Sequence, residues 1–198
     1  MRIFMLVGVT LLGVVVVLVS GYYLLLDWAA LRAAYARFEL LASRSADLNA
    51  LFVGLARSVG IPARDVYGVR VADSKLGYKA LGKSGDITKA QHCRAEFYLA
   101  AYGWVPVDPA DVRKVVLEES GGLPLSDAKV EAARKRLFGS WEMNWMAFNY
   151  AHDVQLPGAK KGQIGFFMYP NAEVGGARVD SLDPDNFKYK ITSREIVS

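Results

Sequence analysis

Three side chains of this sequence have the types needed for acyl transfer: Ser45, His92 and Asp108. A nucleophile at a helix N-terminus is favoured by the helix dipole, an imidazole can take its proton, and a carboxylate can orient that imidazole. The competing interpretation is structural, with Ser45 as a helix N-cap and the other two as hydrogen-bonding strand residues. By themselves the three residue types favour the structural interpretation.

The elements that would position these residues follow one another along the chain. A helix is predicted after Ser45, because apolar residues recur with helical spacing and Gly60 then supplies a natural C-terminal stop; the apolar positions are Leu48, Leu51, Phe52, Leu55 and Val59. Residues 91–99 and 104–107 predict two strands of a hairpin. The pattern predicts an α+β domain.

The register of this hairpin decides whether His92 and Asp108 can meet. If Leu99 pairs with Trp104, Asp108 faces away from His92, because side chains alternate between the two faces of a strand. If Tyr98 pairs with Trp104 instead, Asp108 lies diagonal to His92, at about 7–8 Å between the residues. We predict the second register and one shared face.

Four segments resemble the bacterial transglutaminase-like family, in order and approximate spacing. They are the helical run 47–57, GIPAR at 60–64, HCRAEFY at 92–98 and GWVPVDP at 103–109. The resemblance covers about Ser45 to Val112, with a fainter likeness beyond. It implies a cysteine-protease-like (papain-like) core, a helix packed on an antiparallel sheet. It also implies thiol-dependent amide hydrolysis or acyl transfer on a peptide or protein, without metal or organic cofactor.

The resemblance assigns His92 as the general base and Asp108 as the orienting acid. The family's nucleophilic cysteine lies fifteen positions before the glycine of GIPAR, and Ser45 occupies that position. A helix dipole contributes about 0.3–2 kcal/mol, or one to two pKa units at most, which is far too little to ionise a hydroxyl. We therefore expect the chemistry to be lost or impaired.

Cys93 is the only cysteine of the chain, so an internal disulfide and a multi-cysteine metal site are excluded. Strand alternation predicts that it faces away from His92 and joins Ala95 and Phe97 in the core. It is not expected to replace the missing nucleophile.

Two hypotheses of different classes remain. One is an impaired hydrolase or acyltransferase; the other is a non-catalytic, membrane-tethered module that binds a protein or peptide. The matching region begins at Ser45, where the family carries more of its domain upstream. The sequence is compatible with a truncated lineage of altered function and with a damaged reading frame.

The first residues predict a membrane anchor. Residues from Ile3 to Leu26 carry no charge and suffice to cross a bilayer of about 30 Å. A signal peptide cleaved after Ser20 or Gly21 is the alternative, but the apolar run exceeds a usual signal core. We expect residues 1–26 to be an anchor, 27–44 a helical stalk, and 45–198 a domain on the extracytoplasmic or periplasmic side.

Composition adds few constraints. The 198 residues suit one globular domain. The net charge is +4, but the lysines and arginines are scattered among acidic residues, which argues against nucleic-acid binding. We further expect a surface loop over 74–89, a helix from 126 or 127 to 137, and strands over 66–71, 165–169 and 187–191. His152-Asp153 is interpreted as structural. An aromatic set with spacing near four predicts a buried helix face: Trp141, Trp145, Phe148 and Tyr150.

Overall fold

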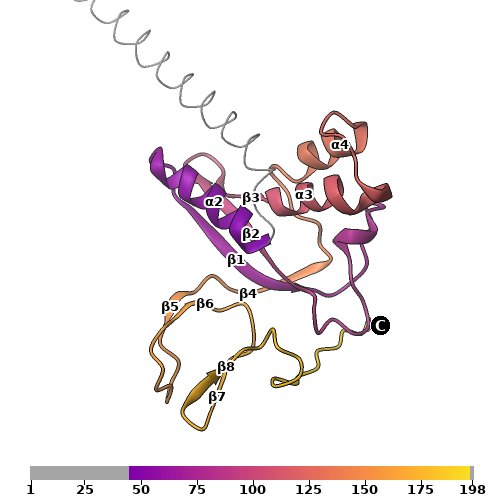
Figure 1. Cartoon of the computed structure of the whole chain (residues 1–198). Coiled ribbons are helices and arrows are strands. Elements are labelled where there is room, and N and C mark those ends of the chain that lie inside the picture. The colour runs from indigo at the N-terminus through magenta and orange to yellow at the C-terminus, as the bar shows by residue number, and fades with distance from the viewer. Residues whose placement is uncertain (1–44, 197–198) are drawn as a thin grey trace, which may run out of the picture. The chain divides into compact units, whose positions relative to one another are not determined.

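A four-stranded antiparallel sheet with one helix along it forms the centre of the structure (Figure 1). The computed structural model describes residues 45–196, with side chains from Ala46 onward. The strand order is β3-β2-β1-β4. The elements are α2 (Ser45–Ser58), β1 (Ala63–Arg70), β2 (Gln91–Leu99), β3 (Gly103–Val107) and β4 (Trp145–Asn149). The predicted α+β class is confirmed; the predicted anchor and stalk lie outside the described residues.

Helix α2 follows its predicted course. It ends at Ser58, and Gly60 takes a φ of +81°, a conformation that glycine adopts without steric cost. Its buried face is apolar: Val53 and Ala56 pack against Ala95 and Phe97 of β2. The helix therefore covers the face of β2 that carries the odd-numbered residues.

The register of β2 against β3 is the second of the two alternatives. Tyr98 pairs with Trp104, and Ala95 pairs with Val107 at the far end of the hairpin. Strand β1 pairs with β2 on its other side, with Gly68 opposite His92. Strand β1 begins at Ala63, three residues before the predicted start at residue 66, because Ala63 to Asp65 also pair with β2.

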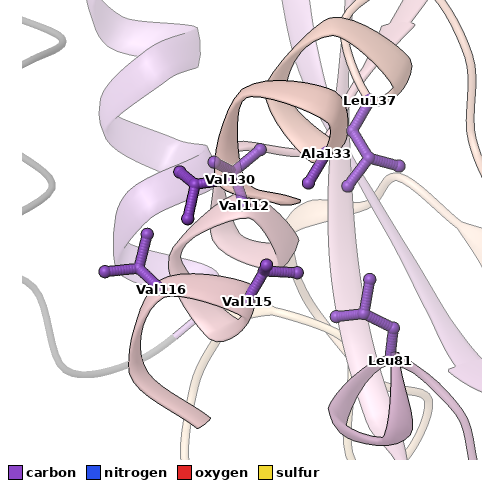
Figure 2. Packing of buried hydrophobic residues seen from close by; sticks show 7 residues of the cluster. All are labelled: Leu81, Val112, Val115, Val116, Val130, Ala133 and Leu137. Carbon is purple, nitrogen blue, oxygen red and sulfur yellow. The ribbon is translucent and has the colours of Figure 1, made fainter. Parts of the chain in front are cut away.

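Helix α3 (Pro109–Glu118) was not predicted. Asp108 caps it, since its carboxylate accepts a hydrogen bond from the backbone N–H of Asp111 at 3.0 Å, and Pro109 occupies the first turn, where its missing N–H is tolerated. Helix α4 (Ala128–Arg136) is capped by Asp127, as predicted. Figure 2 shows the core that α3 and α4 share with Leu81: Val112, Val115, Val116, Val130, Ala133 and Leu137.

The surface loop expected over residues 74–89 is wrong in part. This segment contains the short 3-10 helix η1 (Lys79–Leu81), and Leu81 and Ile87 are buried. Polar and glycine residues surround these two apolar side chains in the sequence. Leu81 packs against α3 and Ile87 packs against β1, and these two contacts attach the segment to the domain.

The helix predicted for the aromatic run is wrong. Trp145 lies in strand β4 opposite Arg70, with Trp145 buried and Met146 and Phe148 exposed. An interval of four places residues on one side of a strand as well as of a helix, so the spacing did not discriminate.

The C-terminal third forms two small hairpins. These are β5 (His152–Val154) with β6 (Ile164–Phe166), and β7 (Ala172–Val174) with β8 (Ala177–Val179) around Gly175 and Gly176. The strand predicted over 165–169 is thus shifted and shortened, and the one predicted over 187–191 does not form. Within residues 45–196, no helix combines the length and the hydropathy needed to cross a bilayer.

Tyr67 attaches this C-terminal part to the sheet. Its ring packs against Phe166 with centroids 5.5 Å apart, and its hydroxyl lies 3.1 Å from Nε2 of His152. The same imidazole nitrogen lies 3.8 Å from Oδ2 of Asp65. Burial raises the pKa of Asp65 to about 6, and the charges of His152 and Arg57 offset only part of this effect.

We predict that Gly68→Ala destabilises the protein by about 1–3 kcal/mol. A β-carbon at residue 68 would collide with the ring of Trp145 and the carbonyl oxygen of Met146. The matched control is Gly54→Ala in α2, where a β-carbon meets nothing within 4 Å and should stabilise the helix by up to about 1 kcal/mol. Urea denaturation measures both; equal midpoints would contradict this packing.

We predict that the free energy of unfolding falls as pH rises from about 4 to about 6 because of Asp65. A carboxyl whose pKa is raised in the folded state binds its proton more tightly there, so folding is penalised once the group ionises. With the pKa of Asp65 raised to about 6, the free energy of unfolding is lower by about 3 kcal/mol above pH 6. Asp65→Asn should remove this slope in urea denaturation at several pH values, whereas Asp185→Asn, at an exposed carboxylate, should keep it.

Candidate functional site

His92 and Asp108 form a hydrogen-bonded pair. Nε2 of His92 lies 2.8 Å from Oδ2 of Asp108. His92 is the second residue of β2, and Asp108 directly follows β3, so the observed register places them on one face as diagonal neighbours. The predicted contact is confirmed, while the catalytic roles of both residues stay predictions.

The charge of Asp108 sets the tautomer of His92. Burial would raise the pKa of Asp108, but the charge and hydrogen bond of His92 and the charges of Arg94 and Arg70 together outweigh burial and hold that pKa well below its usual range. An ionised carboxylate can only accept hydrogen bonds. Nε2 therefore carries the proton, and Nδ1 is the atom that could take a proton from a nucleophile.

Two arginines and a second aspartate complete a buried ion network. Nε of Arg94 lies 3.1 Å from Oδ2 of Asp108. Arg70 pairs with both oxygens of Asp111, and Oδ1 of Asp111 lies 3.3 Å from Nε2 of His92. All five side chains are buried.

Sequence reasoning missed Arg70, Arg94 and Asp111. A signal for two of them existed, because Arg94 lies two residues after His92 on the same strand face, and Asp111 lies three residues after the cap Asp108. The position of Arg70 depends on the pairing of β1 with β2, which local sequence does not determine.

The imidazole of His92 and the carboxylates of Asp108 and Asp111 lie close enough together to hold a metal ion. One ligand atom from each of His92, Asp108 and Asp111 lies within 4.8 Å of the others. However, two guanidinium groups, from Arg70 and Arg94, already balance the two carboxylates. A divalent cation would have to displace them, so the donor set fits an internal ion network better than a cation.

Residue 45 begins helix α2, but its side chain lies outside the described part of the structure. Its neighbour Ala46 packs against a buried cluster of Tyr67, Cys93 and Met168. One turn later, Asn49 donates hydrogen bonds to the carbonyl oxygen of Cys93, at 2.7 Å, and to its sulfur, at 3.4 Å. The position of the Ser45 side chain relative to Nδ1 of His92 remains a prediction.

Cys93 is 0% exposed and lies on the face of β2 that α2 covers. The prediction that it is buried and faces away from His92 is confirmed. Its immediate apolar contacts are Tyr67 and Met168, whereas Ala95 and Phe97, on the same face, belong to the neighbouring cluster under α2.

The arrangement can therefore orient an imidazole and accept a proton at Nδ1. It holds the imidazole and the carboxylate that the resemblance assigns as base and orienting acid, with a serine at the position that the resemblance assigns to the nucleophile.

Comparison with known proteins supports the resemblance. Residues 27–109 match the sequence model of the Transglutaminase-like superfamily. The match begins upstream of Ser45, inside the segment predicted as a stalk, so the likeness extends further toward the N-terminus than the four quoted segments. No solved structure matches the chain significantly.

A relative occurs in Haemophilus influenzae strain Rd. That protein, described as an uncharacterized protein, is 44% identical over 167 residues, which are 79% of this chain and 45% of the relative. The chain thus spans less than half the length of this relative. Over residues 27–109 the chain is therefore similar to the transglutaminase-like superfamily.

Proposed function

We propose that this domain is related to thiol-dependent enzymes that hydrolyse amides of peptides or proteins, or transfer acyl groups from them. We further propose that it has lost most of this activity because Ser45 replaces the nucleophilic cysteine. The proposal is carried by the His92–Asp108 pair at 2.8 Å, in a chain whose sequence has a serine where the family has its cysteine. The substrate or partner is a peptide or protein, and the chemistry needs no metal or organic cofactor.

The chemistry of a hydroxyl supports impairment. A serine nucleophile needs concerted proton removal by a strong base and a well-aimed oxyanion hole. A site that resembles a thiol enzyme offers no reason to expect such an oxyanion hole at this serine.

The second candidate is a non-catalytic binding module. It is favoured by the burial of the pair: His92 is 2% exposed and Asp108 is 0% exposed. At these exposed fractions the pair offers almost no surface to a substrate. In this case the pair is retained for its contribution to the fold.

We further propose that the chain is tethered to a membrane by residues 3–26, with residues 45–198 on the extracytoplasmic side. The support is the uncharged length of that segment. Full-length protein should remain in the pellet after carbonate extraction, and protease added to spheroplasts should digest the domain. A shortened product in the supernatant would refute the tether, and protection from protease would reverse the orientation.

We predict that the wild-type protein has little or no amidase or transamidase activity and that Ser45→Cys creates an activated thiol. Alkylation of residue 45 by iodoacetamide, followed by peptide mapping, should show a pH midpoint below the ordinary thiol value of about 8.5. Adding His92→Ala should move the midpoint back toward that value, because the imidazole no longer accepts the proton.

The matched control is Ala50→Cys, an exposed position in the same helix, which should alkylate with an ordinary midpoint. If the thiols introduced at residues 45 and 50 titrate alike, the site has decayed beyond its nucleophile, and the binding-module hypothesis stands.

A further inference from the structure

A cavity of about 340 Å³ lies beside the start of strand β2. It forms because the segment after β8 folds back over this strand. Ile191 exchanges hydrogen bonds with the hydroxyl of Thr88, and Gln91 donates to the hydroxyl of Tyr189 at 3.2 Å. Its volume lies at the lower end of the range of about 300–1,000 Å³ for ligand pockets, enough for one or two residues of a peptide.

The walls of the cavity are aromatic in large part. Phe187 and Tyr189 pack edge to face with centroids 5.6 Å apart, and Tyr169 lines the cavity as well. All three side chains are half-buried, so each is held in place and still exposes part of its ring. Such surfaces favour an apolar or aromatic side chain.

Both charged side chains that line the cavity are cations. Lys89 and Lys188 line it, and within residues 45–196 neither ammonium forms an ion pair. No aspartate or glutamate is among the described lining residues.

Three acids of the same segment lie close in sequence, Asp180, Asp183 and Asp185, but none of them lines the cavity. Asp180 accepts a hydrogen bond from the backbone of Leu182, and Asp183 accepts from the side chain of Asn186. The lysines are therefore left to attract an anionic ligand.

Tyr169 connects the cavity with the start of α2. It lines the cavity and also packs against the cluster of Tyr67, Cys93 and Met168 that supports Ala46. Gln91, which also lines the cavity, directly precedes His92 in β2. The cavity and the start of α2 thus border the same buried cluster.

We propose that this cavity binds the carboxylate of a peptide together with an adjacent apolar or aromatic side chain. The carboxylate pairs with Lys89 and Lys188, and the side chain packs on Tyr169, Phe187 and Tyr189. The carboxylate is either the C-terminus or an acidic side chain. The proposal rests on the proposed function, since it names the substrate or partner class of the same domain.

The test is binding of three short peptides to the full-length protein in detergent by isothermal titration calorimetry. The peptides are N-acetyl-Ala-Phe with a free C-terminus, its C-terminal amide, and N-acetyl-Glu-Phe-amide. At least one carboxylate peptide should bind at least about tenfold more tightly than N-acetyl-Ala-Phe-amide. Tighter binding of the free acid assigns the C-terminus, and tighter binding of the glutamate peptide assigns an acidic side chain.

Two substitutions locate the binding. Lys89→Gln and Lys188→Gln should each weaken it by about two- to fivefold, the usual size for an exposed charge pair. Lys190→Gln, at a neighbouring exposed lysine outside the cavity, is the control and should leave binding unchanged. All three positions are exposed, so folding should not change.

Equal binding of acids and amide, binding of none, or an equal effect of Lys190→Gln would overturn the proposal. Because the titration needs no chemistry at residue 45, it is independent of the thiol test. If carboxylate peptides bind but the Ser45→Cys variant is unreactive, the site has lost its catalytic capacity and the cavity proposal stands. A reactive variant without carboxylate binding would reject the cavity alone.

Discussion

Five ionisable side chains are buried together where β1, β2 and α3 meet, and the rest of the domain depends on their mutual pairing. Arg70 comes from β1, His92 and Arg94 from β2, Asp108 from the end of the hairpin, and Asp111 from α3. Removing one partner from such a network leaves an uncompensated buried charge, which costs about 3–5 kcal/mol. The network thus holds two strands of the sheet and a helix in one arrangement.

Asp108 shows how closely fold and site are combined. Its oxygens accept hydrogen bonds from His92 and from the backbone of Asp111, and Arg94 lies against the same carboxylate. One residue therefore orients the imidazole, caps α3 and neutralises a buried arginine. A histidine and an aspartate retained in this geometry are accounted for by stability alone, so their presence does not require that the domain still turns over a substrate.

Local sequence determined the parts of the fold that depend on neighbours along the chain. Strand β2, helix α2 and the cap of α4 lie where periodicity and capping residues indicate, and the register of the hairpin follows from the requirement that His92 and Asp108 share a face. Asp108-Pro109 is also a typical helix start. Helix α3 was not predicted, because this dipeptide was assigned only to the GWVPVDP segment of the family resemblance.

Features that arise from distant contacts could not be predicted in this way. Arg70 reaches Asp111 across 41 residues, and the cavity beside Gln91 exists only because Tyr189 and Ile191 return to β2. Trp145 belongs to a strand because β1 offers an edge to pair with, and spacing within its own segment does not indicate this. In each case tertiary pairing decides, and a single sequence does not report tertiary pairing.

The central claim is that an ionised Asp108 holds His92 through Nε2 and leaves Nδ1 as the proton acceptor. Nitrogen-15 NMR of the imidazole, in protein labelled at histidine, tests this directly near neutral pH, with His152→Gln used to assign the two histidines. The account predicts that neutral His92 is protonated at Nε2 and that the resonance of this proton is shifted downfield by the hydrogen bond to Asp108. In Asp108→Asn the resonance should leave this downfield position. A His92 ring protonated at Nδ1, or one whose nitrogen shifts do not respond to Asp108→Asn, would contradict it.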